Sequence, residues 1–173
     1  GKSLGSTVPT DAGSYRAVFK VVEDSNFKDL SETVNFTVSK RALTVTAKPK
    51  TITYGEKPAN DGVTYEGFVN GENEEVLTGT LDFAYDYAQY GNVGSYHITP
   101  KGLTSGNYDI TFTKGILTVK QKDVTIQDVA VEASKVYDGT ANAVITDKGQ
   151  LSANFDGENL TFHVGTAAYD DKN

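Results

Sequence analysis

DAGSYRAVF at residues 11–19 and NVGSYHITP at residues 92–100 are closely similar stretches that lie 81 residues apart. The similarity extends without a gap when residues 11–45 are aligned with residues 92–126, where eight of 35 positions are identical. The identical pairs are Gly13/Gly94, Ser14/Ser95, Tyr15/Tyr96, Lys20/Lys101, Asn26/Asn107, Thr37/Thr118, Val38/Val119 and Thr44/Thr125. A shared register of aromatic, turn and strand positions predicts a shared local fold.

The repeat continues downstream with short insertions. TYGE at 53–56 corresponds to VYDG at 136–139, and VNGEN at 69–73 corresponds to FDGEN at 155–159. We therefore predict three parts of a tandem array, whose modules are about 81 residues long. The parts are the C-terminal part of a preceding repeat at 1–39, a complete module at 40–120, and the N-terminal part of a third module at 121–173.

Alternation of apolar and polar residues predicts that the chain is mainly β. ALTVTA at 42–47 and NYDITFTKGILTV at 107–119 alternate in this way, and Asn-Gly and Ser-Gly pairs supply turns. The period-two positions predict the core of the middle module as Leu43, Val45, Tyr65, Leu81, Phe83, Tyr96, Ile98, Tyr108, Ile110, Phe112, Leu117 and Val119. NGENEEVL at 70–77 predicts one short helix, because an acidic first turn suits a helix N-terminus. This helix favours a β-grasp-like module, and an Ig-like β-sandwich module is the alternative.

The composition excludes several classes of function. The chain contains no Cys, which excludes disulfides, thiolate zinc sites and cysteine nucleophiles. The net charge of −7 argues against binding of nucleic acid, which needs clustered Lys and Arg. No apolar run approaches the roughly 20 residues that span a bilayer. The absence of Cys and Met leaves little to oxidise and suits an exposed protein, although chance in a short chain explains it equally well.

The two joints between the predicted modules contain no Gly or Pro. SKRA at 39–42 separates Val38 from Leu43, and KQKD at 120–123 separates Val119 from Val124. Flexible linkers are rich in Gly and Ser, so this is not a flexible composition. We therefore expect one strand to run almost directly into the next module, and neighbouring modules to hold a fixed relative angle.

Three stretches resemble known repeat families. Residues 42–121 resemble the MBG repeats of bacterial surface proteins, of the type with a Tyr-Gly-x signature, here YGE at 54–56. VAVEASKVYDGTANAVI at 129–145 resembles the start of a YDG repeat, and residues 8–27 resemble the closing half of related Ig-like or MBG-like repeats. The resemblance implies a large secreted or wall-attached protein, often of a Gram-positive gut bacterium, in which such repeats act as stalks or adhesive segments. It implies β-grasp-like or Ig-like folds and no catalytic residues.

No group of residues in the sequence predicts catalysis. His97 and His163 lie in strand-like stretches at non-equivalent positions of the repeat, and an exposed strand histidine explains each of them. Three carboxylates that could attract Ca²⁺ lie close together at Glu72, Glu74 and Glu75. They lack the alternating Asp/Asn ligand pattern, and an acidic helix start explains them more simply. The Asp-Gly pair at 138–139 favours a tight turn over a ligand loop. We therefore expect neither an enzyme nor a cofactor or metal site.

Tyr85, Tyr87 and Tyr90 are the candidate ligand contacts, because tyrosine offers rigid apolar area with a polar tip. Packing in the core is the alternative, since a small module without Trp needs its other aromatic rings inside. Two functions follow: a non-enzymatic stalk or spacer, or an adhesive module that binds host mucin, glycan or glycoprotein. Tandem copying with diverged surfaces favours the spacer.

Neighbouring repeats are the expected partners, and the extracellular cell surface or cell wall is the expected location. Neither the closing part at 1–39 nor the opening part at 121–173 can bury its apolar strand face as a complete module does. An unpaired strand edge is a template for another chain. One hypothesis is therefore a head-to-tail self-association, in which residues 1–39 of one molecule meet residues 121–173 of another. The alternative is that each end packs locally on the middle module or that the module boundaries are misread by a strand.

Overall fold

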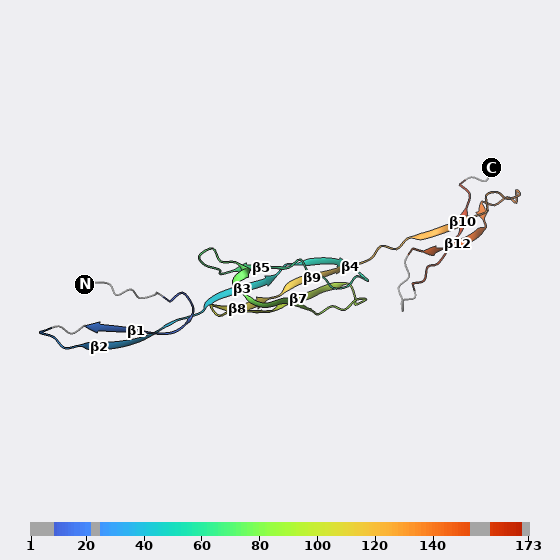
Figure 1. The fold of residues 1–173 in the computed structure, drawn as a ribbon. Helices are drawn as coiled ribbons and strands as arrows, with labels where there is room; N and C mark the ends of the chain where they lie inside the picture. The colour runs from blue at the N-terminus through green and yellow to red at the C-terminus, as the bar shows by residue number, and fades with distance from the viewer. Residues whose placement is uncertain (1–8, 22–24, 153–159, 171–173) are drawn as a thin grey trace. The chain divides into compact units, whose positions relative to one another are not determined.

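The computed structural model describes residues 9–21, 25–152 and 160–170, and the fold is mainly β, as predicted (Figure 1). The chain forms two compact units, Gly1–Lys120 and Gln121–Asn173. The first unit contains a hairpin of β1 (Gly13–Val21) and β2 (Leu30–Val38), followed by the middle module. The FDGEN stretch that was aligned with residues 69–73 lies outside the described residues.

The repeat of the sequence is also a repeat of strand pairing. β1 and β2 pair antiparallel, with Gly13 opposite Val38. In the middle module β7 (Gly94–Thr104) and β9 (Gly115–Lys120) pair antiparallel, with Gly94 opposite Val119. Each of the five pairs between β7 and β9 lies 81 residues after a pair of the first hairpin. Equivalent sequence positions therefore occupy equivalent positions in the two hairpins.

The middle module contains two sheets, with strand orders β5-β3-β8 and β4-β9-β7-β6. Besides β7 and β9, its strands are β3 (Arg41–Ala47), β4 (Lys50–Thr53), β5 (Val63–Glu66), β6 (Thr78–Tyr85) and β8 (Tyr108–Thr113). Within residues 40–120 no α-helix covers either sheet. The helix expected at 70–77 is a single 3-10 turn, η1 (Glu74–Val76), which the Asn73 side chain caps by accepting from Glu75 N at 2.9 Å. The helical part of the β-grasp prediction is thus reduced to this turn.

Two long segments run in parallel through both sheets. β3 pairs with β8 and β4 pairs with β9, and the partners are 67 residues apart throughout, from Arg41 opposite Tyr108 to Thr53 opposite Lys120 (Figure 1). The two segments therefore cross together from one sheet to the other. Gly115 lies at this crossing, where a Cβ would stand 2.5 Å from the carbonyl oxygen of Ala47. A side chain at position 115 would separate the two backbones, which explains the glycine there.

Two clusters of buried side chains form the core of the middle module, one mainly from β4, β7 and β9 and the other from β3 and β8. Six of the twelve predicted core residues are buried: Leu43, Val45, Ile98, Tyr108, Leu117 and Val119. The other six are half-buried: Tyr65, Leu81, Phe83, Tyr96, Ile110 and Phe112. The prediction missed four buried side chains, those of Ala47, Ile52, Tyr87 and Pro100.

The Tyr-Gly-x signature at 54–56 forms the turn that follows β4. Glu56 N donates to Thr53 O at 3.1 Å, and Thr53 N donates to Glu56 Oε2 at 2.7 Å. Gly55 has a φ of 90°, as the third position of a type II turn requires, and glycine adopts this value without steric strain. The signature therefore encodes a closed turn held by both backbone and side chain.

The described residues of the second unit form four strands: β10 (Ile126–Val131), β11 (Asn142–Ala143), β12 (Ile145–Leu151) and β13 (Ala167–Ala168). β10 pairs antiparallel with β12, and β11 with β13. The antiparallel pair of β10 and β12 corresponds to that of β3 and β5 in the middle module. None of the described residues of this unit is buried, so they show strand pairing without a closed core.

Candidate functional site at the joint between two repeats

Asn107 joins the β1–β2 hairpin to the middle module. Its Oδ1 accepts a hydrogen bond from Ala12 N at 2.8 Å, and its Nδ2 donates to Asp11 Oδ1 at 2.9 Å. Its backbone oxygen accepts from Arg41 N at 2.9 Å, at the start of β3. One residue thus binds the segment before β1 and the segment after β2. In the sequence Asn107 is distinguished only as the repeat partner of Asn26, and this repeated asparagine is the signal that could have pointed to its role.

The basic residues of the joint are also bound to the module. Lys40 Nζ donates to Ser105 O at 2.8 Å, and Arg41 Nε donates to Gly67 O at 3.2 Å. The hydroxyl of Ser105 accepts from the backbone N–H groups of Asn107 at 3.1 Å and Tyr108 at 3.2 Å, which fixes the turn that presents Asn107. Only two residues separate β2 from β3. The short joint and its hydrogen bonds together restrict the angle between the hairpin and the module.

Tyr108 anchors the module side of the joint. Its ring is buried beside Leu43 and Val45. Its hydroxyl accepts from Val69 N at 3.2 Å and donates to the Glu72 carboxylate. The hydrogen bond to Glu72 raises the pKa of Tyr108 above its ordinary value, and desolvation adds to the rise. Tyr108 therefore stays a neutral donor throughout the physiological pH range.

A small cavity of about 150 Å³ lies at the joint. Its lining includes Ala12 and Ser39 from the hairpin side, and Arg41, Glu72 and Tyr108 from the module side. A water molecule takes up roughly 30 Å³, whereas pockets for small molecules measure roughly 300–1,000 Å³. The cavity has room for a few waters, and its lining comes from both the hairpin and the middle module.

The three tyrosines predicted as ligand contacts lie in different environments. Tyr87 is 4% exposed and belongs to the core. Tyr85 is half-buried, and its hydroxyl accepts a hydrogen bond from Asn60 Nδ2 at 2.7 Å. Tyr90 is exposed, with its ring edge-on to Tyr54 at a centroid distance of 6.5 Å. The structure therefore does not bring the three together as one exposed row, and Tyr87 packs as the core alternative expected.

The histidines and the clustered carboxylates that were considered as sites are all exposed. His97 Nδ1 lies 2.9 Å from Asp86 Oδ2, with both side chains about half exposed, and His163 is exposed. Two of the three clustered carboxylates, Glu74 and Glu75, belong to η1. Across the part of the chain that the structure describes, no three His, Cys, Asp or Glu side chains are grouped so that they could hold a metal ion.

The Asp-Gly pair of the second unit forms a tight turn. Asp138 Oδ1 accepts from Lys135 Nζ, Thr140 N and Thr140 Oγ1, each at 2.9 Å. These bonds, first of all the one from Lys135, lower the pKa of Asp138 to about 2. Gly139 follows with a φ of 78°. The carboxylate thus stays ionised and organises the turn around the YDG signature.

The structure up to Lys120 is thus a β-rich module that follows a β-hairpin across a two-residue link. Residues 43–118 match the family model of the MBG domain (YGX type), and residues 120–173 match that of the YDG domain. The chain thus contains an MBG domain of the YGX type followed by a YDG domain, as its motifs predicted. No curated protein matches the chain significantly. None of the helices among its described residues is long and apolar enough to cross a membrane.

Proposed function

We propose that this chain is a structural segment, a stiff stalk or spacer of a secreted or wall-attached bacterial surface protein. The joint at Asn107 carries the proposal, because a spacer transmits position only when its modules keep their relative angle. Tandem MBG and YDG domains support a repeat-type role. The absence of Cys and Met suits an extracellular location. The partners of each module are its neighbours in the chain.

The joint is stiff in this proposal because its hydrogen bonds close a loop. Asn107 binds Asp11 and Ala12 before β1, and Lys40 of the link binds Ser105 in the same turn of the module. Each bond contributes about 0.5–1.5 kcal/mol. Rotation of the hairpin about the two-residue link would break several of them together.

An adhesive role is the second candidate, and the exposed ring of Tyr90 beside Tyr54 is the observation that favours it. An adhesive module would bind mucin or a glycan array, and Tyr90→Ala would abolish the signal. The spacer proposal expects no such binding by the wild-type chain.

The spacer proposal is tested by a distance measurement across the joint. The chain has no Cys, so Thr33→Cys in β2 and Thr111→Cys in β8 place two spin labels at exposed sites. Pulsed electron resonance should give one narrow distance distribution. Asn107→Asp should broaden it several-fold, because the new carboxylate loses the donor and faces the Asp11 carboxylate. A broad distribution in the otherwise unaltered chain would overturn the spacer proposal.

A charge-pair exchange and a matched control complete the test. Combining Asn107→Asp with Asp11→Asn restores one amide and one carboxylate in exchanged places, so the narrow distribution should return. Asn92 occupies the repeat position of Asp11 at the opposite end of the module, near the pairing of Gly94 with Val119. Asn92→Asp should leave the distribution unchanged. Failure of the exchange to restore the distribution would show that the Asn107 side chain does not hold the angle.

A further inference from the structure

Asn70 and Gly71 form the only Asn-Gly pair of the sequence, and both residues lie in an exposed turn. Glu72 N donates to Val69 O at 2.9 Å and closes the turn. Asn70 has a φ of 56° and Gly71 a φ of 77°, and a type I′ turn requires positive φ at both of its central residues. A Cβ built on Gly71 would have no atom of the described residues within 4 Å, its chain neighbours apart. The backbone nitrogen of Gly71 is therefore not shielded by packing.

An asparagine that precedes glycine can lose its side-chain amide without an enzyme. The backbone nitrogen of Gly71 gives up its proton and attacks Cγ of Asn70, so that a new C–N bond forms and the side-chain amide leaves as ammonia. The product is a five-membered succinimide ring. Water then hydrolyses one of the two carbonyl–nitrogen bonds of the ring, which leaves an aspartate or an isoaspartate at position 70. Water is the only co-reactant, and no electrons are exchanged.

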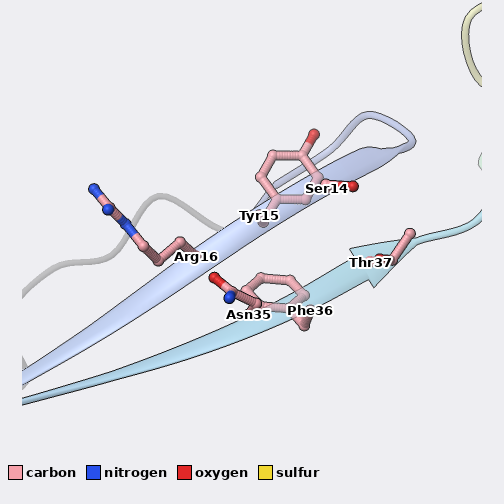
Figure 2. Close-up of a pocket in the computed structure, with 6 residues that line it drawn as sticks. All are labelled: Ser14, Tyr15, Arg16, Asn35, Phe36 and Thr37. Carbon is pink, nitrogen blue, oxygen red and sulfur yellow. The ribbon is translucent and has the colours of Figure 1, made fainter.

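Exposure alone does not create such a site, as Asn35 shows. Asn35 is exposed too, but it lies opposite Arg16 in the regular antiparallel pair of β1 and β2. The residue that follows it is Phe36, and Figure 2 shows both side chains on β2. A large side chain after the asparagine hinders the approach of the backbone nitrogen to Cγ, and strand pairing restrains the backbone. Asn35 is therefore an internal control for Asn70.

One side chain holds both ends of the turn at Asn70. The Tyr108 hydroxyl accepts from Val69 N at 3.2 Å and donates to the Glu72 carboxylate. Ring closure requires a backbone rotation that brings the Gly71 nitrogen to Cγ, and a turn held at both ends resists this rotation. The Tyr108 hydroxyl therefore slows the reaction at Asn70, which proceeds when the turn opens.

The same turn is part of the joint between the hairpin and the middle module. Asn70 and Glu72 line the cavity of about 150 Å³, together with Ala12 and Ser39 from the hairpin side. Deamidation places a second carboxylate near that of Glu72, and like charges repel each other. An isoaspartate also adds one methylene to the backbone. A turn that is longer by one atom no longer presents both of its ends to Tyr108, so the module side of the joint loses its fixed shape.

We propose that Asn70 is a site of spontaneous deamidation, that Tyr108 restrains the reaction, and that the reaction loosens the joint. The stiffness of the joint then falls with the age of the molecule. The effect on the joint rests on the proposed function as a stiff spacer, whereas the modification and its restraint by Tyr108 are independent of that function.

Peptide mapping by mass spectrometry tests the modification. The full chain is aged at physiological temperature in mildly alkaline buffer, where the backbone amide loses its proton more readily. Asn70 should be converted to aspartate and isoaspartate, and a methyltransferase that labels isoaspartate should mark the same peptide. Asn35 should stay intact over the same period. If Asn70 stays intact over many half-lives of its conversion in the urea-unfolded chain, it is not a deamidation site of the folded protein.

Two variants test the restraint. Tyr108→Phe should speed the conversion at Asn70 several-fold, because the turn loses its hydrogen bonds to the hydroxyl. Glu72→Ala removes the acceptor at one end of the turn without changing the core, so it should also speed the conversion. Tyr96→Phe removes a hydroxyl elsewhere in the module and is the matched control, which should react like the wild type. Equal rates in the wild type and Glu72→Ala would show that Tyr108 does not restrain the turn.

The spin labels at Thr33→Cys and Thr111→Cys measure the effect on the joint. Ageing should broaden the distance distribution in proportion to the converted fraction. Asn70→Gln should keep its narrow distribution through the same treatment, because the longer side chain closes its six-membered ring far more slowly. A distribution that stays narrow in fully converted chains would overturn the effect of deamidation on the joint. A distribution that is broad before ageing, while Asn70 is intact, would instead contradict the spacer proposal.

Discussion

The first hairpin and the hairpin of β7 with β9 have the same strand register, yet one has an exposed apolar face and the other lies in a core. Both have a tyrosine whose hydroxyl donates to the backbone four residues earlier, Tyr15 to Asp11 O at 2.8 Å and Tyr96 to Asn92 O at 2.7 Å. Strand pairing and the tyrosine hydrogen bond are therefore local properties of the repeated sequence stretch. Burial is not local, because it needs β3, β4 and β6 from the opening half of the module.

The largest expected difference between the hairpins concerns the side chains at equivalent positions of β9 and β2. Leu117→Ala should destabilise the middle module by about 4 kcal/mol, because it leaves a cavity in a closed core. Phe36→Ala should cost less than about 1 kcal/mol, because Phe36 is already partly in water. Both losses of stability can be measured by urea unfolding at low protein concentration, followed through the backbone amide resonances of each hairpin. Similar losses at the two positions would mean that the hairpin has a core of its own.

A second comparison concerns Gly115 and its repeat equivalent, Val34. Gly115→Val should destabilise the module by about 3 kcal/mol, because its side chain would collide with the Ala47 carbonyl at the crossing of the two parallel segments. Val34→Gly should cost about 1 kcal/mol or less, the ordinary cost of glycine in a strand. The same unfolding experiment applies. A mild effect of Gly115→Val would show that the crossing can open.

The smallest expected difference concerns the two tyrosine hydroxyls. Tyr15→Phe and Tyr96→Phe should each cost about 0.5–1 kcal/mol, because each loses one exposed hydrogen bond. Tyr15→Phe should also weaken the hydrogen bond that Ala12 N donates to Asn107 Oδ1. Amide hydrogen exchange at Ala12 and Gly94 would measure the local effect, as a rise of about two- to five-fold in the exchange rate. Unequal effects on total stability would indicate that burial around Tyr96 strengthens its bond.

The strands, the repeat and half of the core were predictable because they depend on local patterns. Leu43 and Val45 alternate with threonines, and that alternation alone puts them on one face. Ala47 and Pro100 were missed because neither is a large apolar residue, and Tyr87 was weighed as a ligand contact as well as a core residue. The helix expected at 70–77 ended as one turn, since the acidic start has no apolar helical face behind it.

The joint could not be predicted in the same way. Asn107 meets Asp11 and Ala12 across about a hundred positions of sequence, and such a contact depends on the final placement of a loop. The sequence showed that an asparagine recurs at positions 26 and 107, but this recurrence does not indicate which residues Asn107 contacts. The absence of Gly and Pro indicated a stiff link, whereas the hydrogen bonds that restrict it became visible only in the structure.

The parallel pairing of residues 41–53 with residues 108–120 has a consequence for a chain under tension. The module is entered at the start of β3 and left at the end of β9, and these two ends belong to segments that run side by side in the same direction. A pull on the two ends drives the segments past each other lengthwise. All the hydrogen bonds between the two segments are then loaded at the same time. When the two ends of an antiparallel hairpin are pulled apart, by contrast, its hydrogen bonds break one after another, starting at the pulled ends. A pull on the two ends of the module would therefore load it in shear, the direction in which paired strands resist separation best.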